Sequence, residues 1–484
     1  MVLEPPMLDD VTTDSSATTT ATDQADRDVR DRSSLILLVL CSAAFMAMLD
    51  VFVVNVAFTA IGEGYRGSSL ADLSWVLNGY TIVYAALLIP AGRLADRFGR
   101  KKGFLLGVAV FTLASALCAV APTLWWLNGF RALQAGVAAA LTPTSLGLIL
   151  TAMPAARRSF AVKVWATSTS IAAAVGPVIG GALAKVAWQW VFLINVPIGL
   201  VAIVAAVSLV PESRDTSVSK LPDIVGSIVL AASIGALALG LVKGPDWGWA
   251  SGSTLVSFAV AILGLGVFTY RSFHHPSPVL DPALLKVRTF FWANASALLF
   301  CVAFGAVLPS VVLRLENYAD FSPLVTGLAV APGPLMVPVF AIVSQKLTRR
   351  LPVGVVVSIG NTLVAAGAAV MALTATDEVS YVSQILPGWL LVGVGVGFAL
   401  PNVLASATVD LPPASAATGS AVVNTSRQLG WVFGFTMLVA ILGTLISSDG
   451  QALTVFTRAW WAIAAVALLG AAASLGITPS DPND

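Results

Sequence analysis

The stretch GRLADRFGRKK, residues 92–102, lies where the second long apolar run of the chain ends. It packs five basic residues into a short connection, and the next apolar run begins directly after it. A short, basic connection between two apolar runs is typical of the cytoplasmic side of a membrane protein. Asp96 stands among the arginines, where a carboxylate can hold a turn by ion pairs or cap a facing helix.

The composition outside this stretch also indicates lipid as the solvent. Of the 484 residues, 57% are hydrophobic and 11% are charged, whereas an ordinary soluble domain carries about 25% charged residues. A soluble chain of this length cannot hide so much apolar surface. The net charge of +1 gives no basic footprint for nucleic acid.

Fourteen apolar runs are long enough to span a bilayer, which takes about 20 residues each. The runs lie at about 34–61, 73–95, 103–121, 124–150, 160–184, 189–210, 222–242, 250–270, 290–313, 323–345, 353–375, 382–406, 417–447 and 456–477. Polar segments at 211–221 and 271–288 divide them into six, two and six. We therefore predict an all-α integral membrane protein with two pseudo-symmetric six-helix bundles and a site between them near the midplane.

The domain boundaries follow from these polar segments. Residues 1–33 are rich in Asp, Thr and Ser, lack the apolar core of a signal peptide, and are predicted to be a disordered tail. The remaining parts are an N-terminal bundle at 34–211, a link with two inserted helices at 212–272, a second link at 273–288, a C-terminal bundle at 289–478 and a short tail at 479–484.

The distribution of Lys and Arg predicts the orientation. If the N-terminus is cytoplasmic, 19 of the 26 basic residues fall on the cytoplasmic side, and Arg131 and Arg427 lie within runs. Those expected on the outer side are Arg66, Lys185, Lys243, Arg314 and Arg458. By the positive-inside rule, a multi-pass protein in the cytoplasmic membrane with both termini inside is expected.

Asp50, in AMLDVFVVNVAF, is an acid deep inside the first run, about 16 Å from its outer end. An ionisable residue at this depth is a functional candidate by default. Arg131, in LNGFRALQAG of the fourth run, lies at a similar depth and can pair with it if the two helices are neighbours. A permanently paired structural acid, or a structural arginine satisfied by backbone carbonyls, is the alternative.

The fifth run contains AAAVGPVIGG, residues 172–181. Gly176 and Gly180 are four residues apart and form a smooth face for close helix contact, while Pro177 removes a backbone hydrogen bond and bends the helix. Simple tight packing explains many glycine pairs of this kind. The three cysteines, Cys41, Cys118 and Cys301, are widely spaced and have no metal-ligand pattern.

Taken together, these stretches resemble the major facilitator superfamily in its fourteen-helix drug:proton antiporter branch. The loop motif of that family corresponds to Gly92, Leu94, Ala95, Asp96, Arg97, Gly99, Arg100 and Lys101. The helix-4 motif corresponds to Arg131, Gln134 and Gly136, the antiporter motif to Gly176, Pro177, Gly180 and Gly181, and the helix-1 motif to Leu49, Asp50, Val54, Asn55 and Ala57. The stretches WQWVFLINVPIG, residues 188–199, and NTSRQLG, residues 424–430, are also similar to this branch.

The resemblance implies roles for these residues. Asp50 with Arg131 would couple transport to protons, the residues of the loop motif would latch the cytoplasmic gate, and the glycines of the fifth run would let the bundles rock. Asn55, Gln134, Asn424 and Arg427 are further polar residues within the membrane. The expected function is proton-driven efflux of small lipophilic compounds by a monomer, with the proton gradient as energy source and no cofactor.

Two departures from the family narrow this expectation. SQKLTRRLPVG, residues 344–354, keeps the basic residues of a second loop motif but lacks its acid and first glycine, so a symmetric gate is in doubt. The last six runs hold no clearly buried acid, because Asp320, Asp377, Glu378 and Asp449 lie at run ends. Neutral or weakly charged lipophilic substrates therefore fit better than dications.

Three alternatives remain at the level of sequence. The first is a proton-coupled uptake symporter of the same fold, against which the Gly-Pro and Gly-Gly pattern of the fifth run argues. A membrane-embedded enzyme or a receptor would be a different class of protein. An enzyme should show clustered His, Cys or acid ligands, whereas the two histidines, His274 and His275, sit in a polar link. No Walker-type phosphate loop occurs, so ATP is not the expected energy source.

Overall fold

The computed structural model describes residues 15–213, 223–411, 413–443 and 452–478; side chains at a few positions within them, Asp96 included, lie outside the description. The helices are α1 (Ser15–Val56), α2 (Phe58–Gly64), α3 (Leu70–Phe98), α4 (Arg100–Ala119), α5 (Leu124–Ala152), α6 (Ala155–Val186), α7 (Trp190–Leu193), α8 (Asn195–Leu209), α9 (Ile224–Trp247), α10 (Gly252–His274), α11 (Arg288–Tyr318), α12 (Pro323–Val330), α13 (Pro332–Leu347), α14 (Val353–Thr374), α15 (Leu386–Val409), α16 (Pro413–Gly443) and α17 (Ala452–Ser474). A 3-10 turn, η1 (Leu284–Lys286), and a π-helical turn, η2 (Tyr381–Ile385), complete the order.

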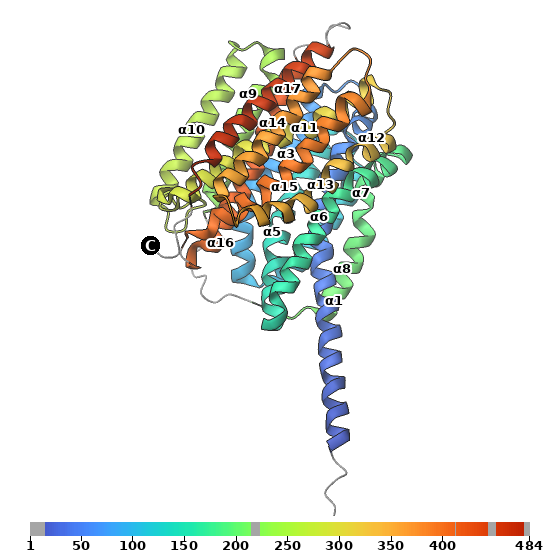
Figure 1. The fold of residues 1–484 in the computed structure, drawn as a ribbon, viewed down its shortest axis with the longest axis vertical. Coiled ribbons are helices and arrows are strands. Elements are labelled where there is room, and N and C mark those ends of the chain that lie inside the picture. Colours follow the sequence, from blue (N-terminus) through green and yellow to red (C-terminus); the bar gives the residue numbers. More distant parts are fainter. Residues whose placement is uncertain (1–14, 214–222, 412, 444–451, 479–484) are drawn as a thin grey trace, which may run out of the picture.

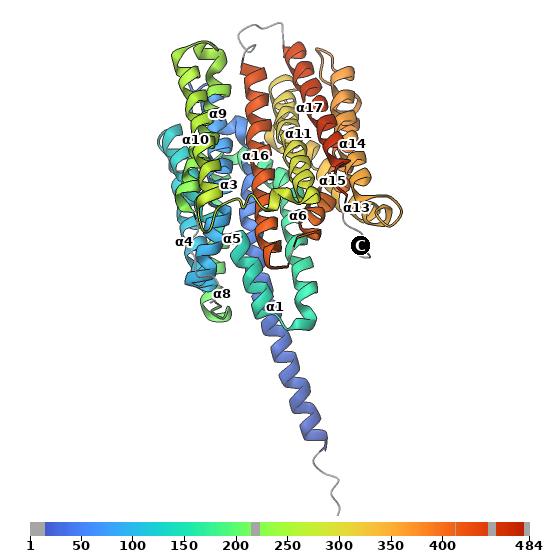
Figure 2. The same ribbon diagram turned by 90° about the vertical axis from the view of Figure 1, so that its left-hand side faces the viewer.

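The prediction of an all-helical membrane fold is confirmed. Within the described residues, 13 helices are long and apolar enough to cross a membrane. The remaining predicted run, 73–95, is covered by α3, a helix of 29 residues. The helices stand side by side in one bundle, from which the start of α1 projects as a long single helix (Figures 1 and 2).

Local sequence explains where several helices begin. The Ser69 hydroxyl accepts from the Asp72 amide, and the Asp72 carboxylate accepts from the Ser69 amide, so α3 starts with a capping box. Thr123, Ser251 and Ser322 cap α5, α10 and α12 in the same position. Pro323 lies in the first turn of α12, where the backbone N–H that proline lacks would have no partner within the helix.

Two ends of the bundle are distinguished by their connections. At the "Gly99 end", α3 turns through Gly99 into α4; at the "Tyr65 end", α2 leads past Tyr65 to α3. Gly99 has φ of +123°, a backbone conformation that side chains other than glycine rarely adopt. α1 rises from the Gly99 end, where residues 15–33 are helical although we predicted a disordered tail over 1–33. Helix propagation from the apolar part of α1 accounts for the extension.

The helices form two groups, α1–α8 and α11–α17. The pairs α1–α6, α3–α5 and α4–α5 pack within the first group, and α14–α15, α11–α16 and α14–α17 within the second. The groups meet through α3–α16 and α6–α12. α9 packs against α10 and also against α3 and α16, one helix from each group.

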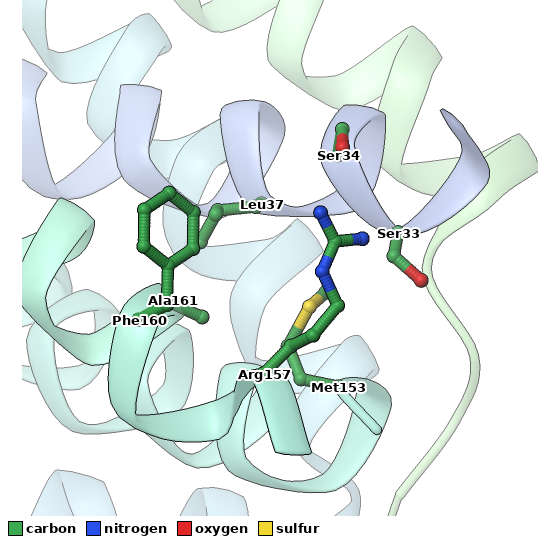
Figure 3. A pocket seen from close by; sticks show the side chains of 7 residues that line it. All are labelled: Ser33, Ser34, Leu37, Met153, Arg157, Phe160 and Ala161. Carbon is green, nitrogen blue, oxygen red and sulfur yellow. The ribbon is translucent and has the colours of Figure 1, made fainter. Parts of the chain in front are cut away.

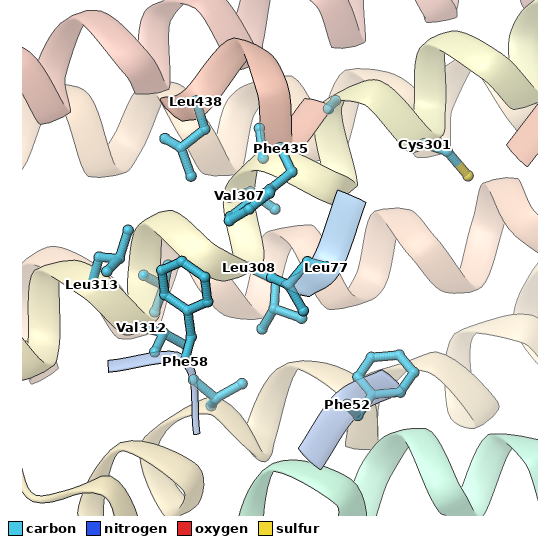
Figure 4. Packing of buried hydrophobic residues seen from close by; sticks show 14 of the residues in the cluster. Phe52, Phe58, Leu77, Cys301, Val307, Leu308, Val312, Leu313, Phe435 and Leu438 are labelled. Carbon is cyan, nitrogen blue, oxygen red and sulfur yellow. The ribbon is translucent and has the colours of Figure 1, made fainter. Parts of the chain in front are cut away.

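The buried core continues across the interface between the two groups. Phe52 and Phe58, from α1 and α2, belong to the same apolar cluster as residues of α11 and α16 (Figure 4). The Phe58 ring meets the Phe435 ring edge to face at 5.6 Å between centroids, an arrangement that aromatic pairs prefer. The two groups are therefore joined here by apolar packing.

Charged residues near the end of α11 correct two expectations. We expected Arg314 on the outer side, beyond the apolar run; it belongs to α11 and is buried there, with Nη2 donating to the Thr376 carbonyl at 2.6 Å. We found no clearly buried acid in the last six runs, yet both carboxyl oxygens of Glu316 are buried. Both errors have one cause: α11 continues to Tyr318, beyond the apolar run that we ended at 313.

Candidate functional site

The polar site of the first helix group is built around Asp50 of α1, which is 1% exposed. Its carboxylate forms an ion pair with Arg131 of α5, itself 1% exposed. Packing of α1 on α5 brings these residues together, as the sequence expectation required. Oδ2 of Asp50 accepts from Nη1 of Arg131, so the buried negative charge has a buried positive partner.

Two amides complete the coordination of Asp50. Its Oδ1 accepts from Nε2 of Gln134 at 3.1 Å and from Nδ2 of Asn195 at 3.0 Å. Gln134 Oε1 in turn accepts from Arg131 Nη1 at 2.7 Å, and Gln134 Nε2 also donates to Ser115 Oγ at 2.8 Å. Hydrogen bonds of this kind satisfy the lone pairs that a buried ion pair would otherwise leave unmade.

Arg131 is held by further contacts. Its Nε donates to the Val76 carbonyl at 3.3 Å. Its Cζ lies 4.1 Å from the centroid of the Tyr80 ring and 5.7 Å from that of Phe192, within the range of cation–π attraction. The guanidinium is thus fixed by carboxylate, backbone and ring contacts at once.

Asn195 is a site residue that the sequence analysis missed, although it quoted the stretch that contains it. It is 0% exposed and opens α8 within the sixth apolar run. Its Oδ1 has no hydrogen-bond partner in the described part of the chain. A buried amide inside a spanning run was the available signal, because polar residues at this depth are rare and tend to be functional.

Asn55 does not join the site. It is 5% exposed on α1, but its Nδ2 donates to the Val51 carbonyl of its own helix at 2.8 Å. Asn424 and Arg427 of α16 lie elsewhere and bond to each other, with Arg427 Nη1 donating to Asn424 Oδ1 at 3.0 Å. Of the four further polar residues, only Gln134 contacts Asp50.

The loop motif surrounds the start of α4. The Lys101 amide donates to Glu212 Oε1 at 3.1 Å, and the Arg100 amide donates to the Ser213 carbonyl at 2.8 Å. A Cβ placed on Gly99 would stand 3.0 Å from the Glu212 carboxyl. The acid seen at this helix N-terminus is therefore Glu212, which the sequence analysis did not select.

Other parts of the loop motif contact neighbouring helices. Gly92 is buried, and a Cβ there would meet the Pro143 ring of α5 at 3.1 Å. Lys101 Nζ donates to the Val207 carbonyl of α8 at 2.8 Å, whereas Arg97 is exposed. The ion pairs expected of Asp96 lie outside the described residues.

The glycines of α6 make very close contacts with α1 and α12. A Cβ on Gly181 would stand 2.1 Å from the Pro323 carbonyl oxygen of α12. Gly176 and Gly180 face Phe52 and Val53 of α1, with a Cβ at 2.6 Å and 2.8 Å from their nearest atoms. Pro177 lies within α6, and its carbonyl oxygen faces Gly327. Backbones approach here so closely that any side chain would force them apart.

A shallow pocket lies away from this site, between the middle of α1 and the start of α6. Ser33, Leu37, Met153, Arg157 and Phe160 are among its lining residues (Figure 3). Leu37 is 13 residues before Asp50, about 20 Å along the helix. The pocket is therefore separate from the buried ion pair. No group of three or more His, Cys, Asp or Glu side chains that could hold a metal occurs among the described residues.

Comparison with protein families places the chain among known transporters. A family described as Major Facilitator Superfamily matches residues 40–435. A methylenomycin A resistance protein of Bacillus subtilis is 32% identical over 453 residues, which cover 91% of this chain and 92% of that protein. The multidrug efflux pump LfrA of Mycolicibacterium smegmatis is 31% identical over 419 residues, covering 86% and 81%.

A tetracenomycin C resistance and export protein of Streptomyces glaucescens is 30% identical over 421 residues, which cover 87% of this chain and 77% of that protein. Among solved structures, a peptide transporter POT in complex with sulfate aligns with a TM-score of 0.66 at 17% identity, covering 91% of this chain and 94% of that one. At this identity the likeness shows the fold alone.

Proposed function

Because the chain belongs to the major facilitator superfamily, we propose that it is a proton-driven exporter of small lipophilic compounds across the cytoplasmic membrane. Relatives named for resistance, efflux and export support this function, since they are similar to the chain over most of its length. The buried Asp50–Arg131 pair is the single observation that supports proton coupling.

The chemistry of the pair explains how a proton can drive a change of state. In the ionised form, Asp50 neutralises Arg131 and accepts hydrogen bonds from Gln134 and Asn195. Protonation removes the negative charge and leaves Arg131 buried without its partner, at a cost of about 3–5 kcal/mol. A rearrangement of the helices that gives Arg131 another partner or water then becomes favourable, and a differential energy of this size shifts a two-state equilibrium strongly.

The other motif residues support a rocking movement of two bundles, at 34–211 and 289–478. At the Tyr65 end, α6 packs closely on α12. This contact corresponds to bundles that are closed at that end. The loop motif at the Gly99 end, with Asp96, Arg97, Arg100 and Lys101, is the proposed gate at the opposite end. The Gly99 end is the cytoplasmic one because most Lys and Arg residues belong to connections at that end. Both termini are then cytoplasmic, and the transporter acts as a monomer that exchanges substrate for protons.

The decisive experiment compares the wild type with Asp50→Asn in inside-out vesicles. With an acidic vesicle interior, the wild type is expected to accumulate a lipophilic dye, and an uncoupler should abolish the accumulation. Asp50→Asn should show no accumulation above vesicles without the protein, because an amide cannot exchange a proton. Asp246→Asn, at an exposed acid of α9, is the matched control and should transport normally.

Two outcomes would contradict the proposal. Accumulation by Asp50→Asn at the wild-type rate would refute coupling through Asp50. Dye movement in the same direction as protons, out of acid-loaded vesicles, would support the uptake symporter instead.

A further inference from the structure

A second arginine, Arg427 of α16, lies within the membrane span without an acidic partner. No ion pair of the described residues includes it, and its Nε is buried without a hydrogen-bond acceptor. Its Nη1 donates to Asn424 Oδ1 at 3.0 Å, one turn earlier on the same helix. A guanidinium at membrane depth is costly unless a negative charge or several acceptors balance it. Arg427 is partly exposed, and the uncharged Asn424 amide oxygen and Cys301 thiol lie beside it.

Arg427 lies near the start of the membrane span of α16. This span covers Val422–Leu442, so Arg427 is five residues, about 7.5 Å, inside it, and its side chain is partly exposed. An anion that enters between the two helix groups can therefore reach its guanidinium.

Arg427 faces the space between the two helix groups. It lies beside the Cys301 thiol of α11, and a Cβ on Gly430, one turn later, would meet Cys301 Cβ at 2.6 Å. Tyr84 of α3, in the first group, lies close enough for its hydroxyl to interact electrostatically with Arg427. The guanidinium thus has neighbours from both groups, as a substrate site between two rocking bundles requires.

Aromatic side chains lie near Arg427 along the interface of the two helix groups. Trp431, one turn after Arg427, contacts Phe52 of α1 at 6.4 Å and Phe304 of α11 at 5.2 Å between ring centroids. Tyr84 stacks on Tyr80 at 6.2 Å with an angle of 12° between the rings. Flat faces and edges of this kind favour an aromatic ligand body.

Tyr80 connects this aromatic group to the proton site. Its ring lies against Arg131, and its buried hydroxyl has no partner in the part of the chain that the structure describes. An acceptor on a ligand beside Tyr84 and Arg427 can take this hydrogen bond. Ligand and proton would then act on neighbouring residues, Tyr80 and Arg131.

From these contacts we propose that Arg427 recognises an acidic group of the substrate, and that the preferred substrates are flat aromatic compounds with a carboxylate or similar anion. The proposal rests on the proposed export function and specifies its substrate class. It narrows the expectation of neutral or weakly charged lipophilic substrates to anions, because an anion supplies the negative charge that would balance Arg427. Charge-assisted hydrogen bonds to a guanidinium would then favour the anion over its neutral analogue by about tenfold or more.

Binding of a matched ligand pair tests the proposal without requiring transport. The probes are 1-pyrenebutyrate and its neutral amide, 1-pyrenebutyramide, titrated by pyrene fluorescence against purified full-length protein at pH 7.5. The wild type should bind the acid at least about tenfold more tightly than the amide. Arg427→Gln should lose this preference while keeping its affinity for the amide, and Arg427→Lys, which keeps the charge, should retain part of it.

A control variant separates this effect from net charge. Arg458→Gln removes an exposed positive charge from α17 and should keep the preference for the acid. An unchanged preference in Arg427→Gln, or an equal loss of both ligands in Arg427→Gln and Arg427→Lys, would overturn the proposal.

The proposal and the export function can fail separately. If the wild type prefers the acid in binding but accumulates no compound in vesicles, the export function fails and the Arg427 site stands. If it exports a lipophilic dye with protons but binds acid and amide equally, export stands and the Arg427 site fails.

Discussion

At the scale of single residues, Asn195 tests how the ion pair is tuned. Its Nδ2 donates to Asp50 Oδ1 at 3.0 Å, and a hydrogen bond to a carboxylate favours the ionised form. We expect Asn195→Val to move the pH optimum of export to higher pH, because the ionised carboxylate of Asp50 loses one of its two amide donors. The measurement is the initial rate of dye export in vesicles over a series of pH values.

Asn55→Val is the matched control for this prediction. Asn55 is also a buried amide, one turn after Val51 on α1, but it bonds to its own backbone and not to Asp50. Its replacement should leave the pH profile in place. A profile that stays the same in Asn195→Val would mean that the Asn195 hydrogen bond does not influence proton exchange.

Glu316 gives a prediction about stability. Both of its carboxyl oxygens are buried, and although the hydroxyls of Thr59 and Thr326 face them, none of these groups makes a well-formed hydrogen bond within the described residues. An unsatisfied buried group costs about 1–3 kcal/mol. Replacing it with an apolar side chain of similar length, Glu316→Met, should therefore raise the melting temperature in detergent.

An acid with good partners should respond in the opposite way. Glu212 accepts from the amides of Lys101 and Ser213, so Glu212→Met is expected to lower the melting temperature. If Glu316→Met were as destabilising as Glu212→Met, the Glu316 carboxyl would have a stabilising partner in solution that its surroundings do not indicate.

At the scale of helices, the contact of α6 with α12 depends on missing side chains. A Cβ on Gly181 would lie 2.1 Å from the Pro323 carbonyl oxygen, and one on Gly327 would lie 2.2 Å from that of Pro177. Neither neighbour is a flexible side chain, so the helices themselves must move. Overpacking of this kind costs about 1–3 kcal/mol.

We therefore expect Gly181→Ala to disfavour closure of the Tyr65 end and to lower export about tenfold, since 1.4 kcal/mol corresponds to a factor of ten. Distance measurements between spin labels on the two helix groups would show a larger population open at this end. Gly129→Ala on α5 is the control, because its Cβ would meet nothing within 4 Å. Equal export by both variants would show that the close contact is not required.

The inserted pair α9 and α10 is an element whose place was not predictable from hydropathy. Asp223, before α9, accepts from Arg271 of α10 and holds the two helices together at the Gly99 end. At the other end, Nζ of Lys243 lies 2.9 Å from Oδ1 of Asp72 on α3. Ile234 and Ala238 of α9 pack with Ile82 of α3 and with Val432 of α16. α9 thus bridges the two helix groups along the α3–α16 contact.

At the scale of the whole molecule, the orientation in the membrane can be tested with two matched positions. Arg66 and Arg350 are both exposed and stand in short turns at opposite ends of the bundle. In intact cells, an impermeant maleimide should label Arg66→Cys, whereas Arg350→Cys should react only after permeabilisation. The native Cys41, Cys118 and Cys301 are buried and should give little background. The reverse labelling pattern would place the Gly99 end outside.

Hydropathy and charge in the sequence determined the membrane class, the spanning runs and the two residues of the central ion pair. These features were readable because lipid requires long apolar helices whose backbone bonds are internal. Asp50 was readable because an acid within a long apolar run is rare and tends to be functional. The glycine pair of α6 was visible for a similar reason, since close helix contact needs small residues at helical spacing.

Only the tertiary structure decided which polar groups meet. Asn195 reaches Asp50 from a helix far along the chain, Glu212 caps α4 from the end of α8, and Arg427 is left without an acid between two helix groups. The carboxyl oxygens of Glu316 and the side chain of Arg314 are buried because α11 continues past its apolar run. Hydropathy measures how a residue partitions between water and lipid, but burial against other helices and the choice of partner depend on contacts between segments distant in sequence.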